Sequence, residues 1–110
     1  MRLWKRNPLP LVLLAATFAA PVAYADPLAP GRALFKQSAV PACALCHALK
    51  DAGAEGAIGP SLDELKPDAA RVAKALRNGI GQMPAYRDKL TEQQIETLSR
   101  YVARASGAQR

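Results

Sequence analysis

The clearest pattern of hydrophobic and polar positions lies near the end of the chain. Apolar side chains recur there at helical spacing, at Ile95, Leu98 and Val102. Such a stripe, with polar residues between its members, is typical of a helix that packs one face on a core. Thr91 and Gln94 have the spacing of a capping box, in which each side chain accepts a hydrogen bond from the other residue's backbone N–H. The pattern therefore predicts an amphipathic helix that begins at about Thr91.

Two shorter segments also have helical patterns. Residues 67–78 place Val72 and Leu76 on one face, and Gly79 follows where a left-handed residue would end the helix. Residues 30–37 begin with a proline and carry apolar residues a turn later, as expected of a short helix. Residues 51–59 hold three glycines and are interpreted as a loop. No segment shows convincing strand alternation, so the pattern predicts an all-α domain.

The amino terminus has the pattern of a secretory signal peptide. Three basic residues precede an apolar run over residues 9–20, and Ala-Tyr-Ala at residues 23–25 has the small-x-small form of a cleavage site. A retained membrane anchor is the alternative, but a bilayer crossing needs about 20 apolar residues and this run is shorter. The sequence therefore predicts a signal peptide over residues 1–25, cleaved to leave one domain over residues 26–110.

Removal of the signal peptide changes the charge of the chain. The full sequence has 15 Lys and Arg against 9 Asp and Glu, a net charge of +6. Three of the basic residues lie in the signal peptide, so the mature chain has 12 − 9 = +3. With no basic run and few aromatic residues to stack on bases, the sequence gives no support to nucleic-acid binding.

Cys43, Cys46 and His47 form the sequence Cys-Ala-Leu-Cys-His, the spacing at which a c-type haem is attached. Each thiol would add to one vinyl group of the porphyrin, and His47 would supply an axial ligand to the iron. A structural zinc site is poorly supported, because it needs four ligands and the chain has two Cys and one His. A redox dithiol would belong after a strand in a βαβ unit, and a plain disulfide would leave His47 unexplained. Haem attachment is therefore the preferred interpretation, and a buried porphyrin would add apolar core to a short chain.

Met83 is the only methionine after the initiator. A lone methionine is most often core filler. This one, however, lies in residues 79–86, where two glycines permit a close approach to a porphyrin and Pro84 prevents a helix. A thioether is a soft ligand suited to low-spin haem iron, and His/Met ligation raises the reduction potential. We therefore predict Met83 as the sixth ligand.

With these features together, residues 26–110 resemble a class I c-type cytochrome over nearly their whole length. The matching residues are the attachment motif, Gly-Pro-Ser-Leu at residues 59–62, Met83-Pro84 and the two terminal helices. The resemblance implies a small all-α fold whose helices pack around one haem c, covalently bound through Cys43 and Cys46.

The resemblance also implies particular contacts. The carbonyl of Pro60 is expected to accept a hydrogen bond from the second ring nitrogen of His47, which would orient the ring and make it a stronger donor. The first and last helices are expected to cross where a glycine and an aromatic residue of one meet the other, namely at Gly31 and Phe35, with Leu98 and Tyr101 as partners.

Two departures limit what the resemblance implies. Met83 follows His47 by only 36 positions, so the long loops of larger family members are missing. The chain also has no tryptophan after Trp4, so the family's partners for the haem propionates do not carry over. Candidate substitutes for these partners are Tyr86, Arg71 and Arg77.

The resemblance implies a periplasmic one-electron carrier, a function that needs no catalytic residue. Its partners would be redox proteins: a dehydrogenase as donor, and an oxidase or another cytochrome as acceptor. The run from Cys43 to Tyr86 resembles small cytochromes that accept electrons from periplasmic sulfite dehydrogenases. Two alternatives stay open. One is a five-coordinate haem protein, a peroxidase or gas sensor with Met83 detached, although no second histidine is present as a distal base. The other is a fixed electron-transfer subunit of an oxidoreductase complex.

Overall fold

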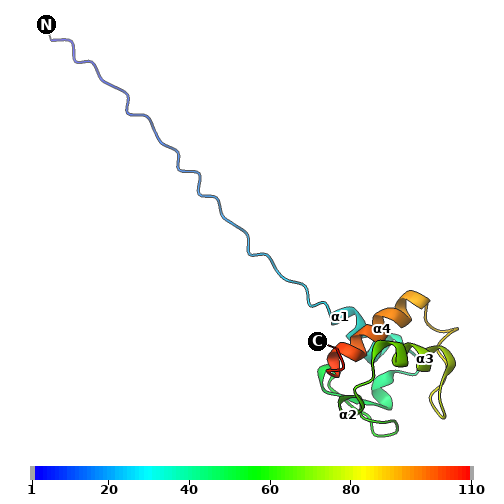
Figure 1. Cartoon of the computed structure of the whole chain (residues 1–110). Coiled ribbons are helices and arrows are strands. Elements are labelled where there is room, and N and C mark those ends of the chain that lie inside the picture. Colours follow the sequence, from blue (N-terminus) through cyan, green and yellow to red (C-terminus); the bar gives the residue numbers. More distant parts are fainter. Residues whose placement is uncertain (1, 110) are drawn as a thin grey trace.

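The computed structural model describes residues 2–109, which divide into an extended amino-terminal segment and a small helical domain (Figure 1). Residues 2–26 contain no helix or strand, and their large apolar side chains are exposed; Trp4 is 89% exposed and Phe18 95%. Across residues 2–109, no helix has both the length and the apolar character that a bilayer crossing requires.

The domain is built mainly from helices and turns. Its α-helices are α1 (Ala29–Ala33), α2 (Leu62–Leu65), α3 (Ala69–Asn78) and α4 (Glu92–Ala105). Helix α1 continues directly into a π-helical turn, Leu34–Ser38. The helices predicted over residues 30–37, over residues 67–78 and from about Thr91 are thereby confirmed. Helix α2 was not predicted, because four residues are too few to show a helical period.

The ends of the longer helices follow the local sequence. Thr91 Oγ1 accepts a hydrogen bond from the Gln94 backbone N–H at 3.1 Å, and Gln94 Oε1 accepts one from the Thr91 N–H at 2.9 Å. The predicted capping box therefore begins α4. At the end of α3, Gly79 has a φ of +69°, the positive value expected of a glycine cap, but its ψ of 169° is extended rather than left-handed helical.

Two short strands correct the prediction of a domain without strands. β1 (Ala48–Leu49) and β2 (Ala54–Glu55) pair antiparallel, with Ala48 opposite Glu55. A 3-10 turn, Lys50–Ala52, and Gly53 with a φ of +60° close this small hairpin. A strand of two residues shows no alternation in the sequence, so only the folded path of the chain reveals it.

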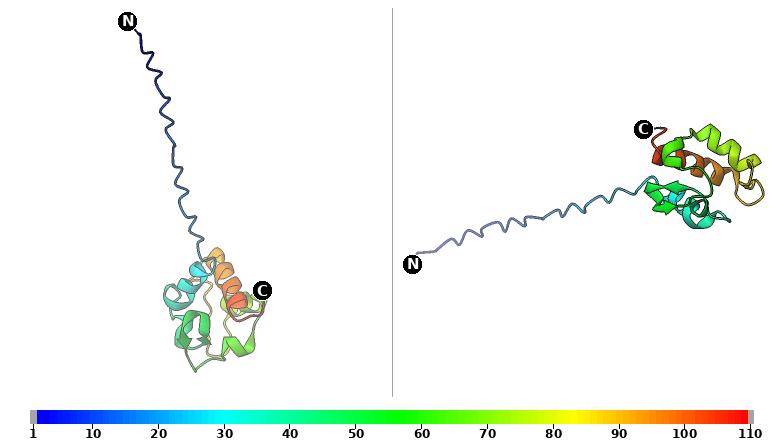
Figure 2. Two further views of the ribbon diagram at one scale, coloured as in Figure 1. Left: turned by 90° about the vertical axis from the view of Figure 1, so that its left-hand side faces the viewer. Right: turned by 90° about the horizontal axis from the view of Figure 1, so that it is seen from below.

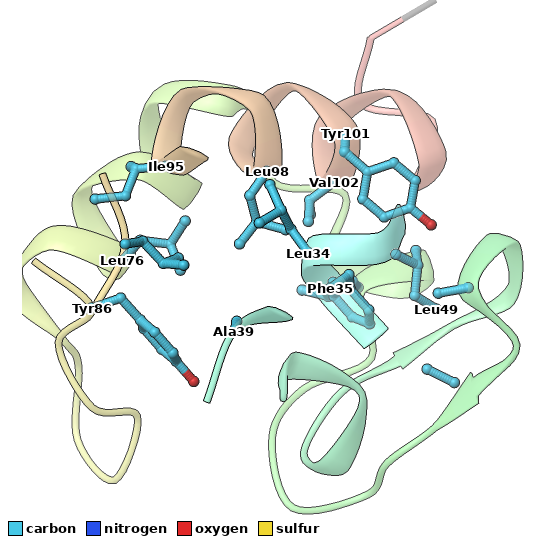
Figure 3. Packing of buried hydrophobic residues seen from close by; sticks show 14 residues of the cluster. Leu34, Phe35, Ala39, Leu49, Leu76, Tyr86, Ile95, Leu98, Tyr101 and Val102 are labelled. Atoms are coloured by element: carbon cyan, nitrogen blue, oxygen red, sulfur yellow. The ribbon is translucent and has the colours of Figure 1, made fainter. Parts of the chain in front are cut away.

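The core lies where α1 and α3 pack on α4 (Figure 2). Gly31 is in close contact with α4, since a Cβ added to Gly31 would lie 2.2 Å from Tyr101 Cβ. The rings of Phe35 and Tyr101 meet edge to face, with centroids 6.1 Å apart (Figure 3). The predicted helix crossing is therefore present at Tyr101. No atom of Leu98 is among the three nearest to the Cβ added at Gly31. The third of these atoms is the backbone carbonyl oxygen of Thr97, at 3.3 Å.

A part-buried cluster of hydrogen bonds joins three segments at this end of the core. The Tyr101 hydroxyl donates a hydrogen bond to Asp51 Oδ2 at 2.6 Å, and Arg32 Nε donates to the same oxygen at 3.0 Å. Burial and the Asp51 carboxylate raise the pKa of Tyr101, which keeps the hydroxyl protonated as a donor. No local pattern indicates this contact, because Tyr101 and Asp51 lie 50 residues apart.

Candidate functional site

The Cys-Ala-Leu-Cys-His motif forms one compact turn. Residues Cys43–Leu45 make a 3-10 helix, and the Cys43 carbonyl accepts hydrogen bonds from the backbone N–H groups of Cys46 and His47, at 3.2 and 3.0 Å. Both cysteines are free thiols and half-buried. Burial raises the pKa of the Cys43 thiol to about 11, so this thiol is protonated at neutral pH.

The ring of His47 is held by the segment that follows the hairpin. His47 Nδ1 lies 2.7 Å from the Pro60 carbonyl oxygen, which is the contact expected from the sequence. A carbonyl only accepts hydrogen bonds, so Nδ1 carries the proton and Nε2 is left with a free lone pair. The Gly59 N–H donates to the Cys46 carbonyl at 2.7 Å and ties the Gly-Pro segment to the motif. This arrangement fixes the imidazole tautomer that is needed for ligation through Nε2.

Two glycines allow the backbone to pack closely on the motif. A Cβ added to Gly59 would lie 2.6 Å from His47 Cε1. A Cβ added to Gly56 would lie 2.5 Å from the Cys46 carbonyl carbon and 2.6 Å from the backbone nitrogen of His47. Both distances are far shorter than an ordinary contact, so both positions require glycine. The role of Gly56 was missed in the sequence analysis, where residues 51–59 were interpreted only as a loop.

Met83 lies in a tight turn that follows α3. Ile80 and Met83 form an isolated antiparallel bridge, with their two backbone hydrogen bonds at 3.1 and 2.9 Å. The turn depends on glycine at two positions, since Gly79 and Gly81 have φ values of +69° and +56°. At Gly79 an added Cβ would also lie 2.8 Å from the Met83 carbonyl oxygen. The glycines thus bring Met83 back against the end of α3.

A cavity of about 820 Å³ brings these segments together. Its wall includes Cys43, Cys46 and His47 from the motif, and Gly59 and Pro60 from the following segment. The loop after α3 contributes Met83 and Pro84, and the helices contribute apolar side chains: Leu62, Val72, Leu76, Leu98 and Val102. The five residues predicted to attach a haem, ligate its iron or orient the axial histidine therefore line one cavity: Cys43, Cys46, His47, Pro60 and Met83.

The cavity has a cationic part formed by α3. Arg71 and Lys74 line it, and within residues 2–109 no acidic side chain does. Two of the three candidate partners for haem propionates bond to other groups of the protein. Arg77 does not line the cavity and forms an ion pair with Glu92 at 2.8 Å. Tyr86 lines the cavity, but its hydroxyl donates a hydrogen bond to the Pro41 carbonyl at 2.6 Å. Lys74 was missed in the sequence analysis.

The cavity suits a porphyrin on three grounds. Its volume lies in the range of about 300 to 1,000 Å³ that is usual for cofactor sites. Its lining is mostly apolar, whereas its charged side chains are cations, which complements an apolar ring with carboxylate substituents. Two thiols and an imidazole with a free Nε2 lie in one wall, and a thioether lies in the loop after α3. These residues fit the covalent attachment and ligation of a haem.

A helical domain with this cavity and this attachment turn is that of a c-type cytochrome. Residues 26–102 match the family described as "Cytochrome C oxidase, cbb3-type, subunit III", and the chain belongs to this cytochrome c family. Family membership implies electron transport by haem c, covalently attached through Cys43 and Cys46.

Among solved structures, the chain is similar to the c-type cytochrome SorU from Sinorhizobium meliloti. The two sequences are 54% identical, and the match covers 74% of this chain and 93% of SorU with a TM-score of 0.71. No curated protein sequence matches the chain.

Proposed function

We propose that this protein is a periplasmic one-electron carrier whose haem iron is ligated by His47 and Met83. The observation that carries the proposal is that the chain's one histidine and its one methionine after Met1 line the same cavity. They come from two separate segments, the attachment turn and the loop after α3. With both axial positions filled by the protein, no substrate would reach the iron, and electron transfer would be the function that remains.

When bound, haem c supplies the redox couple of its iron. The chain's own residues supply the setting for that couple. Pro60 accepts the Nδ1–H of His47 and thereby directs Nε2 to ligation, and the mostly apolar wall would surround the bound ring. Arg71 and Lys74 are the side chains placed to pair with the carboxylates of the bound group.

We also propose that residues 1–25 are a signal peptide that is removed after export. The family match begins at residue 26, directly after the predicted cleavage site. The apolar side chains of residues 2–25 are exposed and contribute nothing to the core. Intact mass measurement of the protein purified from the periplasm is expected to give a chain that begins at Asp26 and carries one haem.

The electron donor that we propose is a periplasmic sulfite dehydrogenase, and the support is the sequence resemblance over Cys43 to Tyr86. The test is to mix purified, oxidised protein with a sulfite dehydrogenase and sulfite, and to follow reduction of the haem. Reduction that needs both enzyme and sulfite would support this donor. No reduction at any ionic strength would remove it and leave the carrier function intact.

The ligation is tested by optical spectra of the oxidised and reduced protein, exported from cells that attach haem. We expect sharp low-spin bands when reduced, and the weak far-red band of a methionine–iron bond when oxidised. In Met83→Ala the far-red band should disappear and the spectrum become high-spin. The matched control is Gln82→Ala, because Gln82 lines the same cavity one residue away but has no soft ligand atom. It should keep the band.

A high-spin spectrum of the unaltered protein that shifts on addition of carbon monoxide would contradict the proposal and favour an open haem site. A far-red band that survives in Met83→Ala would show that the sixth ligand is a different group. Either result would leave the chain a c-type cytochrome.

A further inference from the structure

Tyr86 connects the methionine loop to both sides of the haem cavity. Its backbone N–H donates a hydrogen bond to the Leu76 carbonyl in α3, at 2.6 Å. Its hydroxyl donates to the carbonyl of Pro41, two residues before the first haem-attachment cysteine, also at 2.6 Å. The side chain is only 3% exposed. Tyr86 is thus fixed at both ends, three residues after Met83.

The other hydrogen bonds of the methionine loop run within the loop or to α3. The Ile80–Met83 bridge is local to the loop, and the Gly79 N–H bonds back to Ala75 in α3. Arg87 bonds to Asn78, also in α3. Among residues 2–109, the Tyr86–Pro41 contact is the one hydrogen bond that joins residues 79–89 to the segment leading into the attachment turn. Ile80, which pairs with Met83 in the bridge, is 69% exposed and so contributes little packing of its own.

We infer that Tyr86 is a positioning residue whose hydrogen bond to Pro41 holds Met83 in place for iron ligation. The inference rests on the proposed His47/Met83 ligation. Without this bond the loop stays attached to α3 but loses its link to the attachment turn. Met83 would then leave the iron more readily, while the ring that remains in Tyr86→Phe would still fill its place in the core. Tyr86 and Tyr101 belong to the same hydrophobic cluster but lie at its opposite ends (Figure 3).

The test compares Tyr86→Phe with Tyr101→Phe in the haem-containing protein. Both changes delete one buried tyrosine hydroxyl that makes a 2.6 Å hydrogen bond. Imidazole is the probe, because it competes with methionine for ferric iron, and its binding is followed by loss of the far-red band. We expect the apparent affinity for imidazole to rise about tenfold in Tyr86→Phe, which corresponds to about 1.4 kcal/mol in the release of Met83. Tyr101→Phe should leave that affinity within about twofold, since Tyr101 does not line the cavity.

Thermal unfolding, followed by circular dichroism, is measured on the same samples. The inference is supported if Tyr101→Phe is the less stable variant while Tyr86→Phe binds imidazole more tightly. A general loosening of the protein would instead make the less stable variant the one that binds imidazole more tightly. Equal imidazole affinities in the unaltered protein and Tyr86→Phe would overturn it, and so would equal increases in both variants. If the unaltered protein has no far-red band, the proposed ligation itself fails, and the inference falls with it.

Discussion

A methyl group added at Gly59 should disturb the histidine that is placed to ligate the iron. The Cβ of Gly59→Ala would lie 2.6 Å from His47 Cε1 and 2.9 Å from Nδ1, whereas ordinary contact begins at 3.4 Å. The ring or the loop must therefore move by about 0.8 Å. The loop has little freedom, because the Gly59 N–H is bonded to the Cys46 carbonyl at 2.7 Å. We expect the imidazole to move.

The size of the effect follows from these distances. A shift of about 0.8 Å along the Nδ1–Pro60 contact would stretch it from 2.7 Å to about 3.5 Å, where a hydrogen bond is nearly lost. Losing that bond costs about 1 kcal/mol, and the overpacking adds about 1 to 3 kcal/mol. Gly59→Ala should therefore lower the free energy of unfolding by about 2 to 4 kcal/mol.

Two measurements on the haem-containing protein test this prediction. Chemical denaturation gives the free energy of unfolding, and NMR gives the exchange rate of the His47 Nδ1 proton, which should rise about fivefold for a loss of 1 kcal/mol. The control is Gly53→Ala, where a Cβ meets no atom within 4 Å and only the left-handed backbone, with a φ of +60°, is penalised. It should cost about 1 to 2 kcal/mol and leave the ring proton unchanged. An unchanged exchange rate in Gly59→Ala, with a stability equal to that of Gly53→Ala, would show that the added methyl group does not displace the imidazole.

Two further predictions concern the packing and pairing of helices. Gly31→Ala places a Cβ 2.2 Å from Tyr101 Cβ, so we expect a loss of about 3 kcal/mol and a melting temperature at least about 10 °C lower. At Gly107 an added Cβ meets no atom within 4 Å, so Gly107→Ala carries only the backbone penalty of a φ of +87°, about 1 to 2 kcal/mol, and should melt at a higher temperature than Gly31→Ala. Equal melting temperatures of the two variants would argue against the helix crossing as described. Arg77 donates a hydrogen bond that lowers the pKa of Glu92 below its ordinary value of 4.5. The pair therefore stabilises the fold fully at a pH above 4.5, and this contribution is lost as the pH falls through the lowered pKa. Glu92→Gln should therefore weaken the acid-side dependence of stability, measured as unfolding midpoints from pH 7 downward; an unchanged dependence would mean that the pair contributes nothing in solution.

Features that depend on near neighbours could be predicted from the order of the amino acids. The capping box of Thr91 and Gln94 and the helical stripe of α4 involve residues within a few positions of one another, so their pattern is visible in the chain. The attachment motif is equally local, since Cys43, Cys46 and His47 share one turn. The His47–Pro60 contact is not local, and it was expected only because the sequence resembles a known family.

Features that depend on where distant segments meet became visible only in the folded chain. Tyr86 was expected near the haem carboxylates, but the folded path brings Pro41, 45 residues earlier, to its hydroxyl. Arg77 was expected there too, but it lies next to Glu92 outside the cavity, whereas Lys74 lines it. Such pairings follow from the relative placement of α3, α4 and the attachment turn. A long polar side chain bonds to whichever partner the packing of the apolar core leaves within reach, and the sequence around it does not specify that partner.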